Sequence, residues 1–285
     1  MKMIKTALSA ALVLAAGVTG FAHAALVTIP QSALTPITQL YTDGIGGGIG
    51  AVAVMTGGGN ANGAGDASGR NDDGFMGPVN LGFTLNFFGG TYTQFYANNN
   101  GNISFTGGNS SYIPSGPIGA AIPTISAWFG DVDTRSSLSG VMHIRQDITD
   151  ELIVTWDHVG YFGAHGDLLN TFQMIVRSSD YAIPVGEGAI GFFWLDMPWE
   201  VTDTSRTAAV GFGNGAGDAV VLEGTNAAGL NRAVDRRSTW FNQDLTPVCG
   251  VPGAPACPTP EPGSLPLVGL ALVAVWGLRR RMNKA

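Results

Sequence analysis

Short stretches in which apolar and polar residues alternate are the feature that most limits how this chain can fold. In Val79–Phe88, the side chains of Leu81, Phe83, Leu85 and Phe87 fall on one face, and polar or small residues fall on the other. A two-residue period is that of a β-strand with one buried face, whereas an amphipathic helix has a period of about 3.6 residues. The pattern therefore predicts a half-buried strand.

Further segments of this kind follow, separated by Gly, Asn and Asp residues. They are GVMHIRQ (140–146), ELIVTWDHV (151–159), NTFQMIVRS (170–178), AIGFFWLDM (189–197), TAAVGFGN (207–214) and AVVLEG (219–224). Asn98–Gly101 separates two more, and its Asn-Gly pair accepts the positive φ angles of a tight hairpin. No segment between Ala25 and Pro262 has the pattern of a capped helix longer than two turns. The sequence therefore predicts an all-β fold, an antiparallel β-sandwich-like domain.

Composition divides residues 25–262 into three parts. Residues 25–69 contain a first strand and a Gly-rich loop, because Gly44–Gly74 is dominated by Gly, Asn, Ala and Asp and predicts an irregular edge, not a strand. Residues 70–246 form the β domain, although the strand pattern fades beyond Thr225. Residues 247–262 are rich in proline and predict a semi-rigid stalk.

The first residues have the order of a secretory signal peptide. Lys2 and Lys5 precede an apolar run, and the small residues Ala22 and Ala24 form the pattern that signal peptidase accepts. We expect residues 1–24 to be removed, so that the mature chain begins at Ala25.

The last residues combine a short apolar segment with a basic cluster. Leu265–Leu278 has 14 residues, which as a helix would cover about 21 Å, less than the hydrocarbon core of about 30 Å. Arg279, Arg280 and Arg281 follow, and such a cluster stays on the cytoplasmic side. The sequence predicts a short transmembrane helix that holds the chain transiently in the inner membrane, with its bulk outside.

The order of these parts resembles the PEP-CTERM sorting signal of Gram-negative bacteria that make exopolysaccharide. Pro260, Glu261 and Pro262 precede the apolar segment, and the arginine cluster follows it, so the resemblance covers residues 260–282. It implies that an exosortase-type transpeptidase recognises and cleaves the tail. The expected location is the cell surface or the extracellular matrix.

The charge of the mature part excludes one class of partner. Of the 14 basic and 21 acidic residues in the chain, 8 basic and all 21 acidic residues lie between Ala25 and Pro262, a net charge of −13, and none of the basic ones is lysine. Phosphate backbones are bound by basic surfaces, so we expect no nucleic-acid partner.

The two cysteines of the chain, Cys249 and Cys257, lie in the proline-rich part. An oxidising compartment allows them to form a disulfide. Such a bond would close a small loop and stiffen the stalk.

The centre of the chain resembles the nidogen-like (NIDO) domain, a module of extracellular-matrix and cell-surface proteins. The matching segments are NDDGF (71–75), LGFTLNFFGGTYTQFYANNNGNISF (81–105), ISAWFGDVDTR (125–135), LIVTWDHVGYF (152–162) and NTFQMIV (170–176). They stand in the order of the family and cover roughly residues 70–215. The resemblance implies the fold and a role in matrix adhesion, and it names no partner.

Four aspartates are candidate metal ligands. In an extended segment Asp131 and Asp133 point to the same side, and the turn that contains Asp72 and Asp73 would add oxygens if it folded against them. Such a set suits calcium, which binds about six to eight oxygens. The alternative is that Asp131 and Asp133 cap turns and pair with Arg135. No other cofactor is expected.

Other residue types suggest weaker candidates. His158 and His165, with Asp157 and Asp167 beside them, have the chemistry of a zinc site, but their spacing is more typical of a solvated loop. Of the tryptophans, Trp199 lies between proline and glutamate and is the candidate for an exposed aromatic side chain that stacks on carbohydrate. Trp128 and Trp156 are expected in the core.

These observations favour a non-enzymatic surface or biofilm-matrix protein that acts in adhesion or assembly. Its expected partners are signal peptidase, the exosortase, and a matrix polysaccharide or surface protein. One alternative is a carbohydrate-active enzyme with Asp131 and Asp133 as acid and base, but glycosidases need carboxylates on opposite sides of the sugar. A passive structural spacer is the other alternative.

Overall fold

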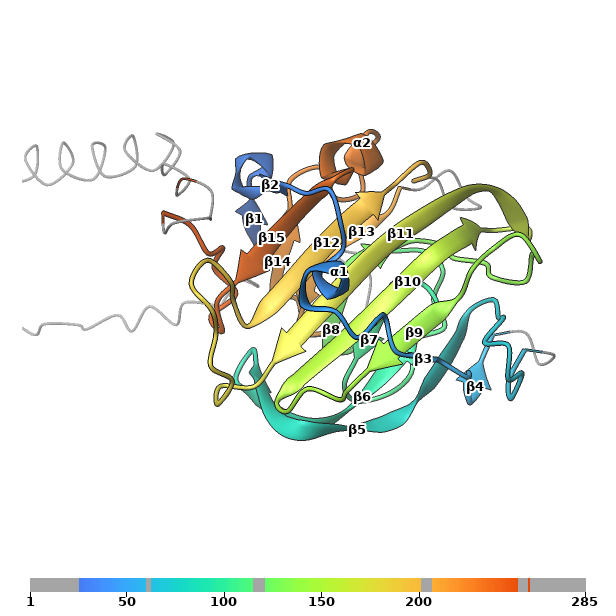
Figure 1. Ribbon diagram of the computed structural model, residues 1–285, viewed down its shortest axis with the longest axis horizontal. Helices are drawn as coiled ribbons and strands as arrows, with labels where there is room; N and C mark the ends of the chain where they lie inside the picture. The colour runs from blue at the N-terminus through green and yellow to red at the C-terminus, as the bar shows by residue number, and fades with distance from the viewer. Residues whose placement is uncertain (1–25, 60–62, 115–120, 201–206, 251–255, 257–285) are drawn as a thin grey trace, which may run out of the picture.

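Two β-sheets packed face to face make up the protein, as seen in a computed structural model that describes residues 26–59, 63–114, 121–200, 207–250 and 256 (Figure 1). In the first sheet the strand order is β1 (Leu26–Ile29), β14 (Ala219–Leu222), β13 (Ala209–Gly213), β8 (Thr124–Phe129), β7 (Asn102–Ser104), β6 (Gly90–Asn98), β5 (Gly74–Phe87) and β4 (Gly57–Gly58). In the second sheet the order is β2 (Thr35–Pro36), β15 (Arg237–Phe241), β12 (Ile190–Asp196), β11 (His165–Arg177), β10 (Glu151–Tyr161), β9 (Met142–Arg145) and β3 (Ala51–Val52).

Antiparallel pairing dominates both sheets, with β1 and β14 forming a parallel pair. The helices of the described residues are short: α1 (Tyr41–Ile45), α2 (Leu230–Val234) and the 3₁₀ turn η1 (Gln31–Ala33). The all-β, sandwich-like class predicted from the alternating pattern is confirmed.

The main core lies between the two sheets and is rich in aromatic side chains. On β5 the predicted apolar face is confirmed, since Leu81, Phe83, Leu85 and Phe87 are 2%, 9%, 4% and 1% exposed. On the facing sheet, the ring of Trp156 stacks on Phe172 at 5.0 Å between centroids. Full burial of an aromatic side chain contributes about 1.5–3 kcal/mol, so these layers supply much of the stability.

The second sheet is buried on its outer face as well, at the centre. Ile153, Ile175 and Phe193 point away from the main core and are 1%, 0% and 8% exposed, because Leu40 and Tyr41 at the start of α1 cover them. In Figure 1 the blue segment with α1 crosses in front of β10, β11 and β12. The middle strands of this sheet are therefore apolar on both faces.

The Gly-rich region is more ordered than its composition indicates. The prediction that Gly44–Gly74 includes no strand is wrong at two places, because β3 pairs with β9 and β4 pairs with β5. Glycine permits this pairing: a Cβ added at Gly50 would lie 2.2 Å from the carbonyl oxygen of Ile144. Residues with small side chains thus form an edge strand of each sheet, because their backbones can come close to the neighbouring strand.

The predicted hairpin at Asn98–Gly101 is confirmed, with one difference in its turn. β6 and β7 pair with Asn98 opposite Asn102, and of the turn residues Gly101 has a positive φ, of 76°. A loop that ends in a left-handed residue is the usual three-residue hairpin connection. A Cβ at Gly101 would lie 1.7 Å from the carbonyl oxygen of Trp128, so the loop fits tightly against the end of β8.

The C-terminal part of the domain extends further than the strand pattern indicated. Arg237–Phe241 forms β15, which pairs with β12, although the pattern fades beyond Thr225. The predicted stalk starts on the sheet, since Pro247 bridges to Phe241 and the amide of Val248 donates to the carbonyl of Trp240 at 2.8 Å. The first residues of the predicted stalk, Pro247 and Val248, are therefore part of the folded domain.

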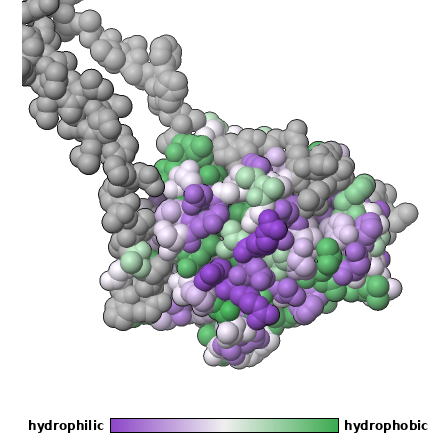
Figure 2. Space-filling model, turned by 90° about the horizontal axis from the view of Figure 1, so that it is seen from above, coloured by the Kyte–Doolittle hydropathy of each residue, from purple (hydrophilic) through white to green (hydrophobic). Residues whose placement is uncertain are grey.

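Within the described part of the chain, no helix has the length and apolarity needed to cross a membrane. The predicted membrane segment, Leu265–Leu278, lies outside the described residues. On the face seen in Figure 2, hydrophilic residues gather in the middle, and hydrophobic residues are scattered around them. Among the coloured residues of this view, the hydrophobic ones form no single large patch of the kind that marks a stable protein interface.

The tight fit at Gly101 leads to a paired prediction. Gly82 on β5 also has a positive φ, of 80°, but a Cβ there would meet nothing within 4 Å. Gly82→Ala is expected to cost only the backbone strain, about 1–2 kcal/mol. Gly101→Ala is expected to cost about 1–3 kcal/mol more, because the added methyl displaces the Trp128 carbonyl.

Urea unfolding of both variants measures the difference. Equal unfolding midpoints for the two variants would contradict the close packing of the hairpin loop against β8.

Candidate functional site

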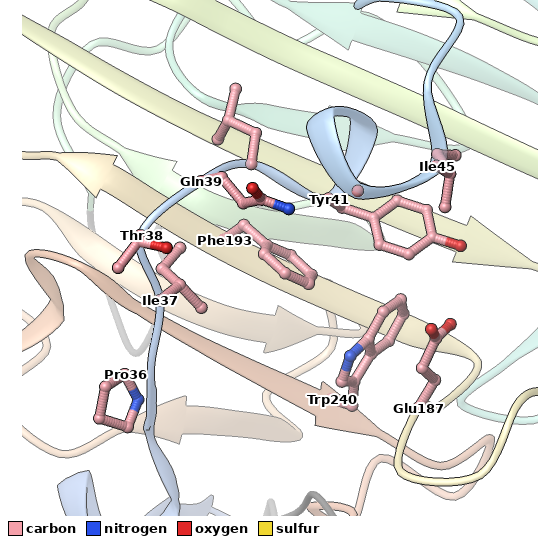
Figure 3. A pocket seen from close by; sticks show the side chains of 11 residues that line it. Pro36, Ile37, Thr38, Gln39, Tyr41, Ile45, Glu187, Phe193 and Trp240 are labelled. Atoms are coloured by element: carbon pink, nitrogen blue, oxygen red, sulfur yellow. The ribbon is translucent and has the colours of Figure 1, made fainter.

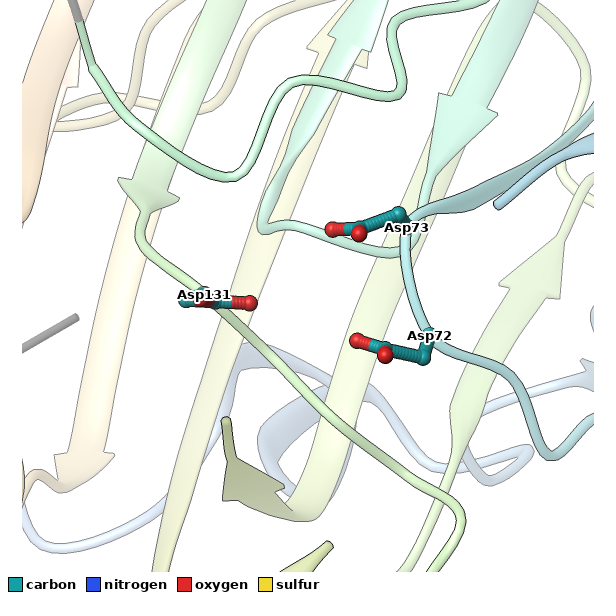
Figure 4. A group of neighbouring side chains, drawn as sticks. All are labelled: Asp72, Asp73 and Asp131. Atoms are coloured by element: carbon teal, nitrogen blue, oxygen red, sulfur yellow. The ribbon is translucent and has the colours of Figure 1, made fainter. Parts of the chain in front are cut away.

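Asp72, Asp73 and Asp131, here called the acidic cluster, come together at one end of the first sheet (Figure 4). One carboxylate oxygen from each lies within 4.8 Å of the others. Asp72 and Asp131 are 6% and 1% exposed, and Asp73 is half-buried. Figure 4 shows the three carboxylates converging from two separate chain segments.

Backbone pairing brings these two segments together. Asp72 forms an antiparallel bridge with Asp133, and the amide of Thr134 donates to the carbonyl of Asn71 at 3.0 Å. The Thr134 hydroxyl also accepts from the amide of Asn71 at 2.8 Å. The predicted folding of the 71–73 turn against the FGDVDTR segment is therefore present.

The hairpin asparagines support the cluster from the other side. The Asn100 side chain donates to Asp73 at 2.7 Å and accepts from the amide of Val132 at 2.9 Å, while Asn99 donates from its side chain to the carbonyl of Val132. Both asparagines are 0% exposed. Sequence reasoning assigned them only to a turn; the run of three asparagines before Gly101 was the available signal for a polar, buried role.

Asp133, the fourth candidate aspartate, is bound by Arg135 and by a loop amide. Its carboxylate accepts from Arg135 Nε at 2.9 Å and Nη2 at 2.5 Å, and from the amide of Ala164 at 2.6 Å. The hydrogen bonds that Arg135 donates to Asp133 outweigh the effect of burial and raise the pKa of Arg135 above its usual value. Asp133 therefore pairs with Arg135, as the alternative expected. The carboxylates that converge are those of Asp72, Asp73 and Asp131, and metal binding stays a prediction.

The chemistry of the acidic cluster suits a hard cation. Two oxygens on opposite sides of a calcium ion at about 2.4 Å are about 4.8 Å apart, and the three carboxylates lie within that separation. Arg135 also bonds Asp72, at 2.8 Å. Among the described residues, Asn71, next to Asp72 in the chain, and Asn99 have buried Oδ1 atoms without a hydrogen-bond partner.

A second candidate is a groove on the outer face of the second sheet, here called the aromatic groove (Figure 3). It has a volume of about 690 Å³ and lies between residues 36–45 and strands β12 and β15. Its lining includes Ile37, Gln39, Tyr41, Glu187, Phe193 and Trp240. Tyr41 lies 5.7 Å from Phe193 and 5.5 Å from Trp240, between ring centroids.

A buried arginine fixes one end of this groove. Arg177 is 0% exposed and bonds Glu151 at 2.7 Å, Glu187 at 2.6 Å and the Tyr41 hydroxyl at 2.6 Å. Its guanidinium also lies 4.5 Å from the centre of the Trp240 ring. Burial alone would lower the pKa of Arg177, but the bonds to both glutamates raise it, so the charge is retained. Burial also raises the pKa of Tyr41, whose hydroxyl therefore stays protonated.

The structure separates or buries the remaining candidates. His158 and His165 form two exposed pairs, with Asp157 at 2.6 Å and Asp167 at 3.3 Å, and they form no metal cluster in the described part of the chain. The prediction that Trp199 is exposed is wrong: it is 4% exposed, and its indole donates to the carbonyl of Val159 at 3.0 Å. The proline and glutamate on either side of Trp199 are typical of exposed segments, which led to the wrong prediction for a core residue.

Several predicted sites lie outside the described residues. They are Ala22, Ala24 and Ala25 of the signal peptide, Pro260, Glu261, Pro262, Arg279, Arg280 and Arg281 of the sorting signal, and Cys257. Cys249 is described and is disulfide-bonded. The disulfide between Cys249 and Cys257 stays a prediction.

Calcium binding by the acidic cluster also stays a prediction, and thermal unfolding tests it. Millimolar calcium is expected to raise the midpoint of the wild-type protein, since a ligand at 100 times its Kd adds about 2.7 kcal/mol. Asp131→Asn removes one of the converging carboxylates and is expected to abolish the rise. Asp180→Asn, at an exposed aspartate, is the matched control and should retain it.

No rise in the wild-type midpoint at millimolar calcium would refute the metal hypothesis. An equal rise in Asp131→Asn would place the ion elsewhere.

Comparison with known proteins agrees with these features. The family model described as NIDO related matches residues 53–240, and that of the PEP-CTERM protein-sorting motif matches residues 258–281. Nidogen from Drosophila melanogaster is 27% identical over 121 residues, which cover 34% of this chain and 9% of nidogen. No solved structure matches the chain.

The sorting motif indicates export, processing by an exosortase, and sorting to the cell surface or the extracellular space. The NIDO-related match includes the acidic cluster and extends to Trp240 in the aromatic groove. It covers well over half of the residues, and the chain therefore belongs to the NIDO-related family.

Proposed function

We propose that this protein is a non-enzymatic component of an exopolysaccharide or biofilm matrix, in which its NIDO-related domain mediates adhesion or assembly. The observation that supports the proposal is the presence, in one chain, of a NIDO-related domain and a PEP-CTERM sorting motif. The motif directs the protein to the surface, and the domain is the folded part that is then displayed. The nidogen-like resemblance implies a role in matrix adhesion, and the similarity of this chain to nidogen agrees with that role.

The structure of the domain favours binding over catalysis. Asp131 and Asp133, the carboxylates that an enzyme acting on polysaccharide would use, are 1% and 0% exposed. Asp133 is also occupied by the guanidinium of Arg135. A general acid and base must contact the substrate, and these two groups face the interior of the protein.

The route to the surface follows from the ends of the chain. Signal peptidase removes residues 1–24, the inner membrane holds the tail transiently, and the exosortase cleaves near Pro260–Pro262. Replacement of Pro260, Glu261 and Pro262 by alanine is expected to leave the protein in the inner membrane with its tail intact. Cell fractionation and the mass of the mature protein measure this, and an unchanged mass and location would contradict the sorting role.

Retention on the matrix tests adhesion. The exported wild-type protein, purified from culture, is expected to co-sediment with crude matrix from the producing cells. An unrelated acidic protein of similar net charge is the control, because nonspecific charge effects would retain both.

Equal retention of the two proteins would favour a passive spacer. Release of soluble sugar from the matrix by the purified protein would instead establish the enzyme alternative.

A further inference from the structure

We propose that the aromatic groove binds a neutral polysaccharide chain, an inference that rests on the proposed function and specifies its ligand. Small-ligand sites are concave, have volumes of about 300–1,000 Å³, and combine aromatic walls with a few polar groups. The groove, at about 690 Å³, has each of these properties. Sugars present apolar C–H faces to aromatic rings and hydroxyl groups to polar side chains, so this lining matches their chemistry.

Trp240 is the partly exposed ring that a sugar can contact, whereas Tyr41 and Phe193, 9% and 8% exposed, hold it in place before any ligand arrives. Trp240 lies directly opposite Gly191 in the sheet, and a Cβ at Gly191 would be 2.5 Å from the indole, so the absent side chain leaves room for the ring. Tyr41 meets the Trp240 ring edge-on, at 85°, and Phe193 does so at 82°. Fixed side chains lose little conformational entropy on binding, which favours affinity.

Polar groups stand at the rim, around the three rings. Figure 3 shows Gln39 above Phe193, and Glu187 at the end of the groove near Tyr41 and Trp240. The Glu187 side chain is 25% exposed while bonded to Arg177. Its second oxygen and the exposed amide of Gln39 suit the hydroxyl groups of a sugar, which both donate and accept hydrogen bonds.

Charge distinguishes neutral from acidic polymers. At this end of the groove, Arg177 is paired with two glutamates, Glu151 and Glu187, which leaves an excess of negative charge. The mature chain as a whole is acidic as well, with 21 acidic residues against 8 basic ones between Ala25 and Pro262. A polyanion would be repelled, so the groove favours a polymer without carboxylate or sulfate groups.

The test uses the exported protein and two fractions of the producer's exopolysaccharide, neutral and anionic, separated by anion exchange. Affinity electrophoresis in gels that contain each fraction measures binding. Retardation by the neutral fraction alone is expected for the wild-type protein. Trp240→Ala is expected to weaken it about tenfold or more, as loss of a central aromatic contact does.

Two further variants separate binding from folding. Gln39 is exposed, so Gln39→Ala leaves the core intact and is expected to weaken retardation by the neutral fraction. Phe162→Ala removes an aromatic side chain that is 46% exposed and does not line the groove, and it should bind like the wild type. Circular dichroism confirms that each variant is folded.

The outcomes distinguish this inference from the proposed function. If the wild-type protein co-sediments with crude matrix but the neutral fraction does not retard it, the groove is not a polysaccharide site and the matrix role stands. The same holds if folded Trp240→Ala and Gln39→Ala both bind like the wild type. Preferred binding of the anionic fraction would overturn the charge argument. Failure of the wild-type protein to bind crude matrix would overturn both proposals.

Discussion

The loop between β6 and β7 is the contact on which much of this structure depends. It lies so close to β8 that the amide of Trp128 donates to the carbonyl of Gly101 at 3.1 Å, which only a residue without a side chain permits. From the opposite sheet, the indole of Trp156 donates to the carbonyl of Asn99 at 2.9 Å. One loop thus contacts both sheets, at Trp128 on β8 and at Trp156 in the middle of β10. The position of Asn99 and Asn100 beside the acidic cluster follows from it.

The position of the aromatic groove depends on the segment that covers the outer face of the second sheet. The chain between β2 and α1 crosses this face, and Gln173 bonds both the Thr42 amide, at 3.2 Å, and the Thr155 hydroxyl, at 2.6 Å. These buried polar contacts fix where the crossing segment lies, because a misplaced segment would leave them unsatisfied. The groove is the space that remains where the segment passes β15.

The strands were predictable from sequence because their side-chain period is local. The face formed by Leu81 to Phe87 and the hairpin at Gly101 needed no knowledge of distant residues. The burial of Trp199 and the partial exposure of Trp240 depend on neighbours far away in the chain, and each stands beside residues that suggest the opposite. The approach of the turn with Asp72 to the segment with Asp133 was predictable, but the bonding of Asp133 depends on Ala164 and Arg135.

Short outer strands limit how copies of this protein can associate. Both sheets end, in the described residues, in strands of two or four residues: β4 and β1 in one, β3 and β2 in the other. An edge with few free amide and carbonyl groups is a poor template for adding a strand from another molecule, the route by which sheets grow into fibres. β4 covers only Gly74 and Phe75 of the longer strand β5, but the rest of that edge contains Pro78, which has no amide hydrogen to donate, and a register shift between Asn80 and Leu85. Proline and such irregularities also hinder strand addition. We therefore expect copies of this domain to associate through their side chains and not by continuing a sheet from one molecule to the next.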